Sequence, residues 1–187
     1  MARLFSWKPA LTYRGRKFKG LRGGAGKPTH PPLTDIPVAA YLLAAIFDGV
    51  SFLAEGEVGR DMFRAATYVI VAGAIVSLPT AATGFWDWLK STARGTQAWR
   101  TANAHMAAMV TVTLIVLVDV VVRIGQWDDG ATGGAVLVLS GAAALLVTIG
   151  AMYGGSLVYD YGFNVETAGD SPVWHESETD VYPGQKA

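Results

Sequence analysis

The sequence predicts an all-α integral membrane protein, a four-helix bundle with both termini in the cytoplasm. Of its 187 residues, 51% are hydrophobic, and the mean hydropathy is +0.32, which is too apolar for an ordinary soluble domain. Four apolar stretches are each long enough to cross a bilayer, which takes about 20 residues. The Lys and Arg residues between them lie almost entirely on one side. Together these observations predict a small multi-pass protein.

Residues 1–34 form the first predicted segment, a basic cytoplasmic arm. Residues 1–27 carry eight Lys or Arg and no acidic residue. No apolar region and small-residue cleavage site follow closely, so this is not a secretory signal. We expect the arm to lie on anionic lipid or on an acidic partner subunit. We expect no nucleic acid partner, because the arm is tethered to a membrane.

The bundle is predicted to span residues 35–159. The expected helices cover residues 35–53, 62–85, 103–124 and 133–159. Segments 107–118 and 135–149 are apolar on all sides, which argues against a soluble bundle, and no alternation of apolar and polar residues suggests a β-barrel. Pro31, Pro32 and Pro37 suit the opening of the first helix, and Pro79 should kink the second. No internal repeat is evident between the two helix pairs.

Charge sets the predicted orientation. The side with the termini and the loop between the second and third helices carries twelve Lys or Arg residues, and the other side carries three. This excess places the first side in the cytoplasm of a cell bounded by an inner (plasma) membrane. Residues 160–187 are predicted to form an acidic, extended tail. The absence of Cys excludes disulfides, thiolate chemistry and a Cys-ligated iron–sulfur or zinc site within this chain.

His30 and His105 are the leading candidate site residues. Both are expected at the cytoplasmic ends of helices, so they can meet although they are distant in sequence. Such a pair suits the ligation of haem iron from both sides, hydrogen bonding to a quinone carbonyl, or a metal site with oxygen from Asp35 or Asp87. The alternative is that each His only caps a helix end or lies among the lipid headgroups.

Other polar and small residues are predicted in the same layer. Asp87 lies between two Trp residues and is expected to receive a proton or to fix a His tautomer. Trp88 is expected at the membrane interface or beside the site. Gly154 and Gly155 favour the close approach of a helix or of a flat ligand, and Tyr159 is expected to hydrogen-bond a ligand carbonyl.

Two carboxylates lie deeper in the predicted membrane region. Asp119 has Arg123 one helical turn later, so an ion pair is expected. Asp48 has no partner in its own helix, and the alternatives are a backbone hydrogen bond, a protonated side chain, or pairing with Arg64 or Arg123. A proton path along the third helix is a further hypothesis.

The ordered motifs resemble the DUF2231 family of bacterial four-helix membrane proteins. The resemblance rests on the sequence from His30 to Leu33, on Gly84 with Asp87 and Trp88, on Asn103 with His105, and on the stretch from Gly154 to Gly162. Actinobacterial relatives sometimes carry a Rieske-type domain. By analogy, this association with redox partners implies the membrane anchor of an actinobacterial succinate dehydrogenase.

The main functional prediction is therefore a membrane-anchor subunit of a respiratory quinone-linked oxidoreductase. It would dock an iron–sulfur partner, alongside other membrane subunits, at the cytoplasmic face. His30, Asp87, Trp88, His105, Gly154, Gly155 and Tyr159 would bind or border menaquinone. One alternative is a b-type haem electron-transfer protein with His30 and His105 as iron ligands. Others are a structural or lipid-interacting membrane protein with no catalytic role and, more remotely, a proton-coupled transporter.

Overall fold

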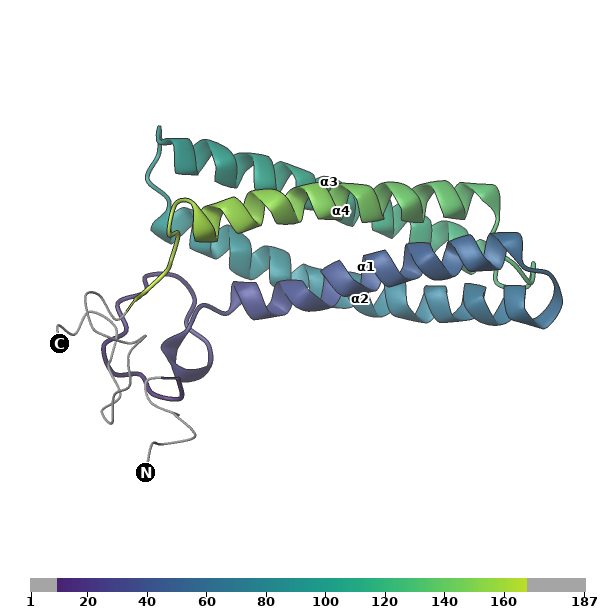
Figure 1. Cartoon of the computed structure of the whole chain (residues 1–187), viewed down its shortest axis with the longest axis horizontal. Helices are drawn as coiled ribbons and strands as arrows, with labels where there is room; N and C mark the ends of the chain where they lie inside the picture. The colour runs from purple at the N-terminus through teal and green to yellow at the C-terminus, as the bar shows by residue number, and fades with distance from the viewer. Residues whose placement is uncertain (1–9, 168–187) are drawn as a thin grey trace, which may run out of the picture.

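The computed structural model describes residues 10–167 and shows an elongated bundle of four α-helices (Figure 1). Helix α1 covers His30–Leu53, α2 covers Gly56–Ser91, α3 covers Gln97–Gly125 and α4 covers Gly134–Tyr159. All four are long and apolar enough to cross a membrane. Only 22–33% of each apolar window is buried inside the bundle, so most of its surface is suited to contact lipid. The predicted all-α membrane fold is confirmed.

Helix ends differ most from the predictions. Helix α1 begins at His30 instead of Asp35, because Pro31 and Pro32 occupy the first turn, where no backbone N–H is required. Helix α2 extends past both ends of the predicted range of 62–85, since polar residues continue a helix beyond its apolar part. Helix α3 begins after Thr96, whose hydroxyl accepts the backbone N–H of Trp99 at 3.1 Å.

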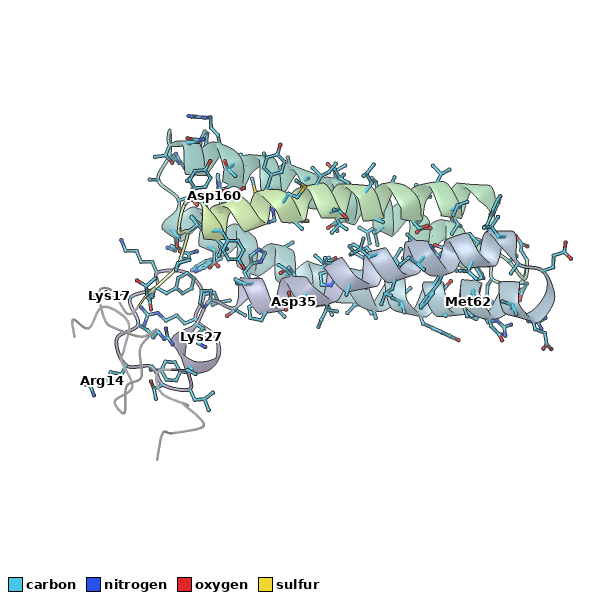
Figure 2. The ribbon with its side chains drawn as sticks, in the orientation of Figure 1. Arg14, Lys17, Lys27, Asp35, Met62 and Asp160 are labelled. Atoms are coloured by element: carbon cyan, nitrogen blue, oxygen red, sulfur yellow. The ribbon has the colours of Figure 1, made fainter. Side chains whose placement is uncertain are left out.

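The described ends of the chain lie at one end of the bundle, here called the arm end (Figure 1). The connection between α2 and α3 lies there too, and the other two connections lie at the opposite end. Figure 2 shows Arg14, Lys17 and Lys27 gathered beside the arm end, far from Met62. The predicted common side for the arm and the α2–α3 loop is confirmed. Which side of the membrane it faces stays a prediction.

The arm is folded, not extended, over its described part, residues 10–29. Phe18 is only 4% exposed, and Gly24–Gly26 form a short 3-10 turn closed by a hydrogen bond from Gly23 N to Lys27 O at 2.7 Å. The guanidinium of Arg16 lies 3.8 Å from Glu166, beyond the end of α4. Contacts within the arm and with the segment after α4 therefore accompany its folded conformation. The predicted tail lies outside the described residues from position 168 onward.

The bundle consists of two similar hairpins, which sequence comparison did not show. Helix α1 packs against α2 and α4, and α3 packs against α4 and α2, so exchanging the two hairpins preserves every contact. Four of the six buried positions of α1 recur 75 residues later in α3. Six of the ten buried positions of α2 recur at a fixed interval in α4. The matched pairs are Pro37/Val112, Tyr41/Val116, Ala44/Asp119, Asp48/Arg123, Ala66/Val136, Ile70/Ser140, Gly73/Ala143, Ser77/Val147, Thr80/Gly150 and Asp87/Leu157.

The interpretation that no repeat exists is therefore wrong at the level of structure. The matched residues share burial but almost never identity, so a comparison of residue types does not detect them. The repeat places an approximate twofold axis along the bundle. Side chains at equivalent positions of α1 and α3, such as Asp48 and Arg123, meet across this axis. The same relation applies to His30 and His105.

Candidate functional site

Two imidazoles face each other near the arm end of the bundle. His30 is the first residue of α1, and His105 lies in the third turn of α3, not in the first turn as predicted. Their ring centres are 6.4 Å apart, and the ring planes are inclined at 79°. Since α1 and α3 belong to different hairpins, the pair lies across the approximate twofold axis. The expectation that the two rings share one neighbourhood is confirmed.

Each imidazole is held by a backbone carbonyl of the other helix in its own hairpin. His30 Nδ1 lies 2.9 Å from the carbonyl oxygen of Thr80, and His105 Nδ1 lies 2.8 Å from that of Gly150. A carbonyl oxygen only accepts hydrogen bonds, so each Nδ1 donates its proton. In the neutral ring, Nε2 then has a free lone pair. Thr80 and Gly150 are equivalent residues of the two hairpins, so both rings are fixed in the same way.

A glycine lies beneath each ring, one helical turn beyond the carbonyl that holds it. A Cβ atom on Gly84 would lie 2.6 Å from His30 Cε1, and one on Gly154 would lie 3.1 Å from His105 Cε1. Both distances are shorter than ordinary van der Waals contact. The absence of a side chain at Gly84 and Gly154 therefore allows the imidazoles to lie flat against α2 and α4.

The carboxylate of Asp87 contacts the arm, and its predicted role as a proton acceptor stays a prediction. Its carboxylate accepts the backbone N–H of Leu21 in the arm at 3.0 Å, and the residue is only 4% exposed. The carboxylate also lies against Gly20, where any side chain would collide with it. The His tautomers are set by backbone carbonyls, so the expectation that Asp87 fixes one of them is wrong. Asp87 anchors the arm to the end of α2.

One known protein family matches most of the chain. The family model described as a predicted membrane protein, DUF2231, matches residues 26–167. The chain belongs to the DUF2231 family. The match includes all four helices, both histidines and both glycines beneath them. No curated protein and no solved structure matches the chain. Membership establishes a membrane protein, and the succinate dehydrogenase role inferred by analogy stays a proposal.

Trp88 of this DUF2231 member joins α2 to α3. Its indole Nε1–H donates to Asn103 Oδ1 at 2.9 Å, and its ring stacks on Phe85 with centres 5.7 Å apart. Asn103 precedes His105 on α3, so this bond holds α3 beside α2 close to the histidine pair. Trp88 is thus a structural neighbour of the pair, and a role in binding a ligand stays a prediction.

The remaining predicted site residues lie on the outside of α4. Tyr159 is 88% exposed, and a Cβ atom on Gly155 would meet nothing within 4 Å. Gly154 contacts the ring of His105 instead of offering a groove to a flat ligand, which supports the helix-packing interpretation for this residue. Any ligand contact of Gly155 or Tyr159 would have to come from the lipid side of α4.

A metal site with three or more side-chain ligands finds no support in residues 10–167. No three His, Cys, Asp or Glu side chains are grouped there in a way that could hold a metal ion. The carboxylate of Asp87 is hydrogen-bonded to the arm. Neither Asp87 nor Asp35 forms a three-ligand metal site with the histidines. The arrangement that does exist is a pair of imidazoles with equivalent supports.

Replacing Asp87 by Ala should release the arm without disturbing the histidine pair. A hydrogen bond to a charged group contributes about 1.5–3 kcal/mol, so the arm should open roughly ten to a hundred times more often. Trypsin should then cleave after Lys19 and Arg22 at a correspondingly higher rate. Asp87→Asn, which keeps an acceptor oxygen, should fall between Asp87→Ala and the native protein, and Asp35→Ala should have no effect. Equal cleavage rates in all four proteins would contradict this anchoring role.

Proposed function

We propose that this protein is the membrane subunit of a respiratory quinone-linked oxidoreductase and that His30 and His105 hold its redox group. The observation that carries the proposal is the adjacent pair of imidazoles, each with Nδ1 hydrogen-bonded to a backbone carbonyl and, within residues 10–167, with no hydrogen bond at Nε2. A histidine that ligates a metal through one nitrogen nearly always donates its other N–H to an oxygen in this way. The succinate dehydrogenase type remains the most specific form of the proposal.

Two imidazoles with ring centres 6.4 Å apart are a donor set that fits haem b, the alternative that the sequence left open. His30 and His105 would hold this group through their Nε2 atoms, because each Nδ1 is hydrogen-bonded to a backbone carbonyl.

Haem b bound here would supply one-electron transfer at its iron. The chain itself supplies position and a fixed donor atom. The carbonyls of Thr80 and Gly150 hold the Nδ1 protons, which keeps Nε2 available and raises its strength as a ligand. Because Gly84 and Gly154 have no side chain, each ring can pack closely against the second helix of its own hairpin. These four residues are positioning residues, because they act through the imidazoles.

Menaquinone is a second candidate, favoured by the same free Nε2 atoms. A neutral imidazole with its proton on Nδ1 cannot donate from Nε2, so it would accept a proton from a quinol hydroxyl. This reverses the direction expected from sequence, in which a His donates to a quinone oxygen. The exposed ring of Tyr159 and the open surface at Gly155 lie on the lipid side of α4, from which a quinol would approach.

The arm end provides the surface for the proposed partner. Six basic residues of the described arm lie there with Lys90, Arg94 and Arg100, and Figure 2 shows Arg14, Lys17 and Lys27 among them. Under the positive-inside rule this end faces the cytoplasm and the membrane is the plasma membrane. We propose that an iron–sulfur subunit docks here, with anionic lipid around it.

The optical spectrum of the purified protein tests the proposal. We expect a Soret band that is lost in His30→Ala and in His105→Ala and kept in His175→Ala, the same change at the chain's third histidine. Circular dichroism of each variant checks that the helices are retained. A colourless protein that still alters menaquinol oxidation by its co-purified enzyme, with sensitivity to His105→Ala, would favour quinone binding over haem. A colourless protein with neither effect would overturn the redox proposal.

A further inference from the structure

A second polar cluster lies at the end of the bundle opposite the arm end. Asp48 of α1 and Asp119 and Arg123 of α3 are each 0% exposed. Ser51 and Thr132 lie beside them, and the Ser51 hydroxyl accepts the backbone N–H of Thr132 at 2.9 Å. The cluster joins α1, α3 and the loop before α4 inside the apolar part of the bundle. Charges in such a place are uncommon and call for compensation.

Asp48 is fully compensated. The Arg123 guanidinium donates to both of its carboxylate oxygens, from Nη1 to Oδ1 at 2.9 Å and from Nη2 to Oδ2. The Thr132 hydroxyl adds a third hydrogen bond to Oδ1 at 3.0 Å. Three donors, two of them from one guanidinium in a bidentate contact, leave both carboxylate oxygens of Asp48 hydrogen-bonded.

Asp119 is poorly compensated by comparison. It receives one hydrogen bond, from Arg123 Nη2 to Oδ2 at 3.0 Å, and that Nη2 is shared with Asp48. Its other oxygen, Oδ1, is buried without a hydrogen-bond partner, and so is Arg123 Nε. An ionised carboxylate is strongly disfavoured in a buried site when one of its oxygens has no hydrogen-bond donor.

The charges around the cluster do not balance if both carboxylates are ionised. Two carboxylates against one guanidinium leave one negative charge. Helix α4 carries no Asp, Glu, Lys, Arg or His between Gly134 and Tyr159. The other residues of these types in α1, His30 and Asp35, lie in its first two turns, at the arm end. From α2, Arg64 lies over the Trp127 ring at 5.6 Å from its centre. No hydrogen bond or ion pair to Asp119 from a second cation is present in residues 10–167.

We infer that Asp119 binds a proton in the folded protein, so that the Asp48–Arg123–Asp119 cluster is neutral and forms a proton-binding site. One proton on Asp119 removes the excess negative charge. It also lowers the free energy needed to bury a carboxylate oxygen that has no hydrogen-bond donor. Met109, Val112 and Val116 separate Asp119 from His105 along α3, and both valines are buried. None of these three side chains carries a titratable group. The proton path along the third helix stays a hypothesis.

Infrared difference spectroscopy in H₂O and D₂O tests this inference on the full-length protein. We expect a C=O stretching band of a carboxylic acid that shifts in D₂O and is lost in Asp119→Asn. Asp48→Asn should also lose the band, because Asp119 then has Arg123 to itself and ionises. Asp61→Asn, a change at an exposed carboxylate, should keep it. The Asp48→Asn result decides the matter if Asp119→Asn fails to fold.

Thermal unfolding distinguishes a proton from a metal cation at the same place. We expect the melting temperature of the native protein to be independent of Na⁺ and K⁺ at constant ionic strength, and Asp119→Asn, which resembles the protonated residue, to melt near it. A native spectrum without the Asp119-dependent band would overturn the inference, as would a melting temperature that rises with one cation only when Asp119 is present. Neither readout involves haem or quinone, so the result is independent of the proposed function.

Discussion

Replacing Arg123 by Met should be among the most destabilising single changes in this protein. Met has a similar length and is tolerated in apolar surroundings. It leaves the Asp48 carboxylate buried without the guanidinium that binds both of its oxygens. Removing one member of a buried ion pair typically costs about 3–5 kcal/mol, because the remaining charge is uncompensated. We expect a loss of this size in the free energy of unfolding, measured by reversible denaturation in mixed detergent.

Arg60→Met is the matched control for this prediction. Arg60 forms its ion pair with Glu57 at 3.9 Å on the surface, where the two side chains are 45% and 89% exposed. Exposed pairs of this kind contribute little. The double change Arg123→Met with Asp48→Leu should recover most of the lost stability, since no buried charge then lacks a partner. Similar losses for Arg60→Met and Arg123→Met, or no recovery in the double variant, would contradict the role of the cluster.

Replacing Gly154 by Val should have a large effect on the histidine site although both histidines stay in the chain. Even a Cβ atom would lie 3.1 Å from His105 Cε1, and the two methyl groups of Val require the ring to move. Forcing extra methyl groups into a packed interior costs about 1–3 kcal/mol. The His105 ring should leave the Gly150 carbonyl, and any haem band should fall to a small fraction of its native intensity.

Gly155→Val is the control next to it on the same helix. A Cβ at Gly155 meets nothing within 4 Å, so this change should leave the spectrum and the stability nearly unchanged. Gly84→Val should resemble Gly154→Val, because the two glycines are equivalent in the two hairpins and a Cβ at Gly84 would lie still closer to its histidine. Equal spectra for Gly154→Val and Gly155→Val would show that Gly154 does not position His105.

The membrane fold could be predicted because lipid imposes a simple rule on sequence. Each span must be apolar on all sides, and segments 107–118 and 135–149 meet this condition directly. Helix ends could not be placed as well, since apolarity marks the membrane-spanning part and not the helix. Helix α2 shows this most clearly, because polar turns at Gly56 and Ser91 extend it at both ends.

The site could be predicted only in part. His30 and His105 were identified because imidazoles at helix ends near one membrane face are chemically informative. Their tautomers could not be predicted, because the oxygens that fix them are backbone carbonyls of Thr80 and Gly150. Every residue has such a carbonyl, so the residue type gives no indication of it. Gly84 and Gly154 belong to the sequence motifs, but only the structure shows that each lies directly against a histidine ring.

Asp87 and Asp48 show the same limit. The hydrogen-bond partner of Asp87 is a backbone N–H in the arm, which residue types do not indicate. Asp48 has no partner in its own helix, and of the four alternatives that the sequence allows the structure shows pairing with Arg123. Both partners are distant in sequence. The hairpin repeat, had it been recognised, would have paired Asp48 with Arg123 and His30 with His105.

The central proposal is that both imidazoles would hold one haem iron, and electron paramagnetic resonance of the oxidised protein tests it most directly. Two imidazole ligands predict a low-spin ferric signal, strongly anisotropic because the ring planes are nearly perpendicular at 79°. His30→Ala and His105→Ala, which should lose the Soret band, should also abolish this signal. A native protein without a haem iron signal, or a low-spin signal that survives in both variants, would contradict the claim.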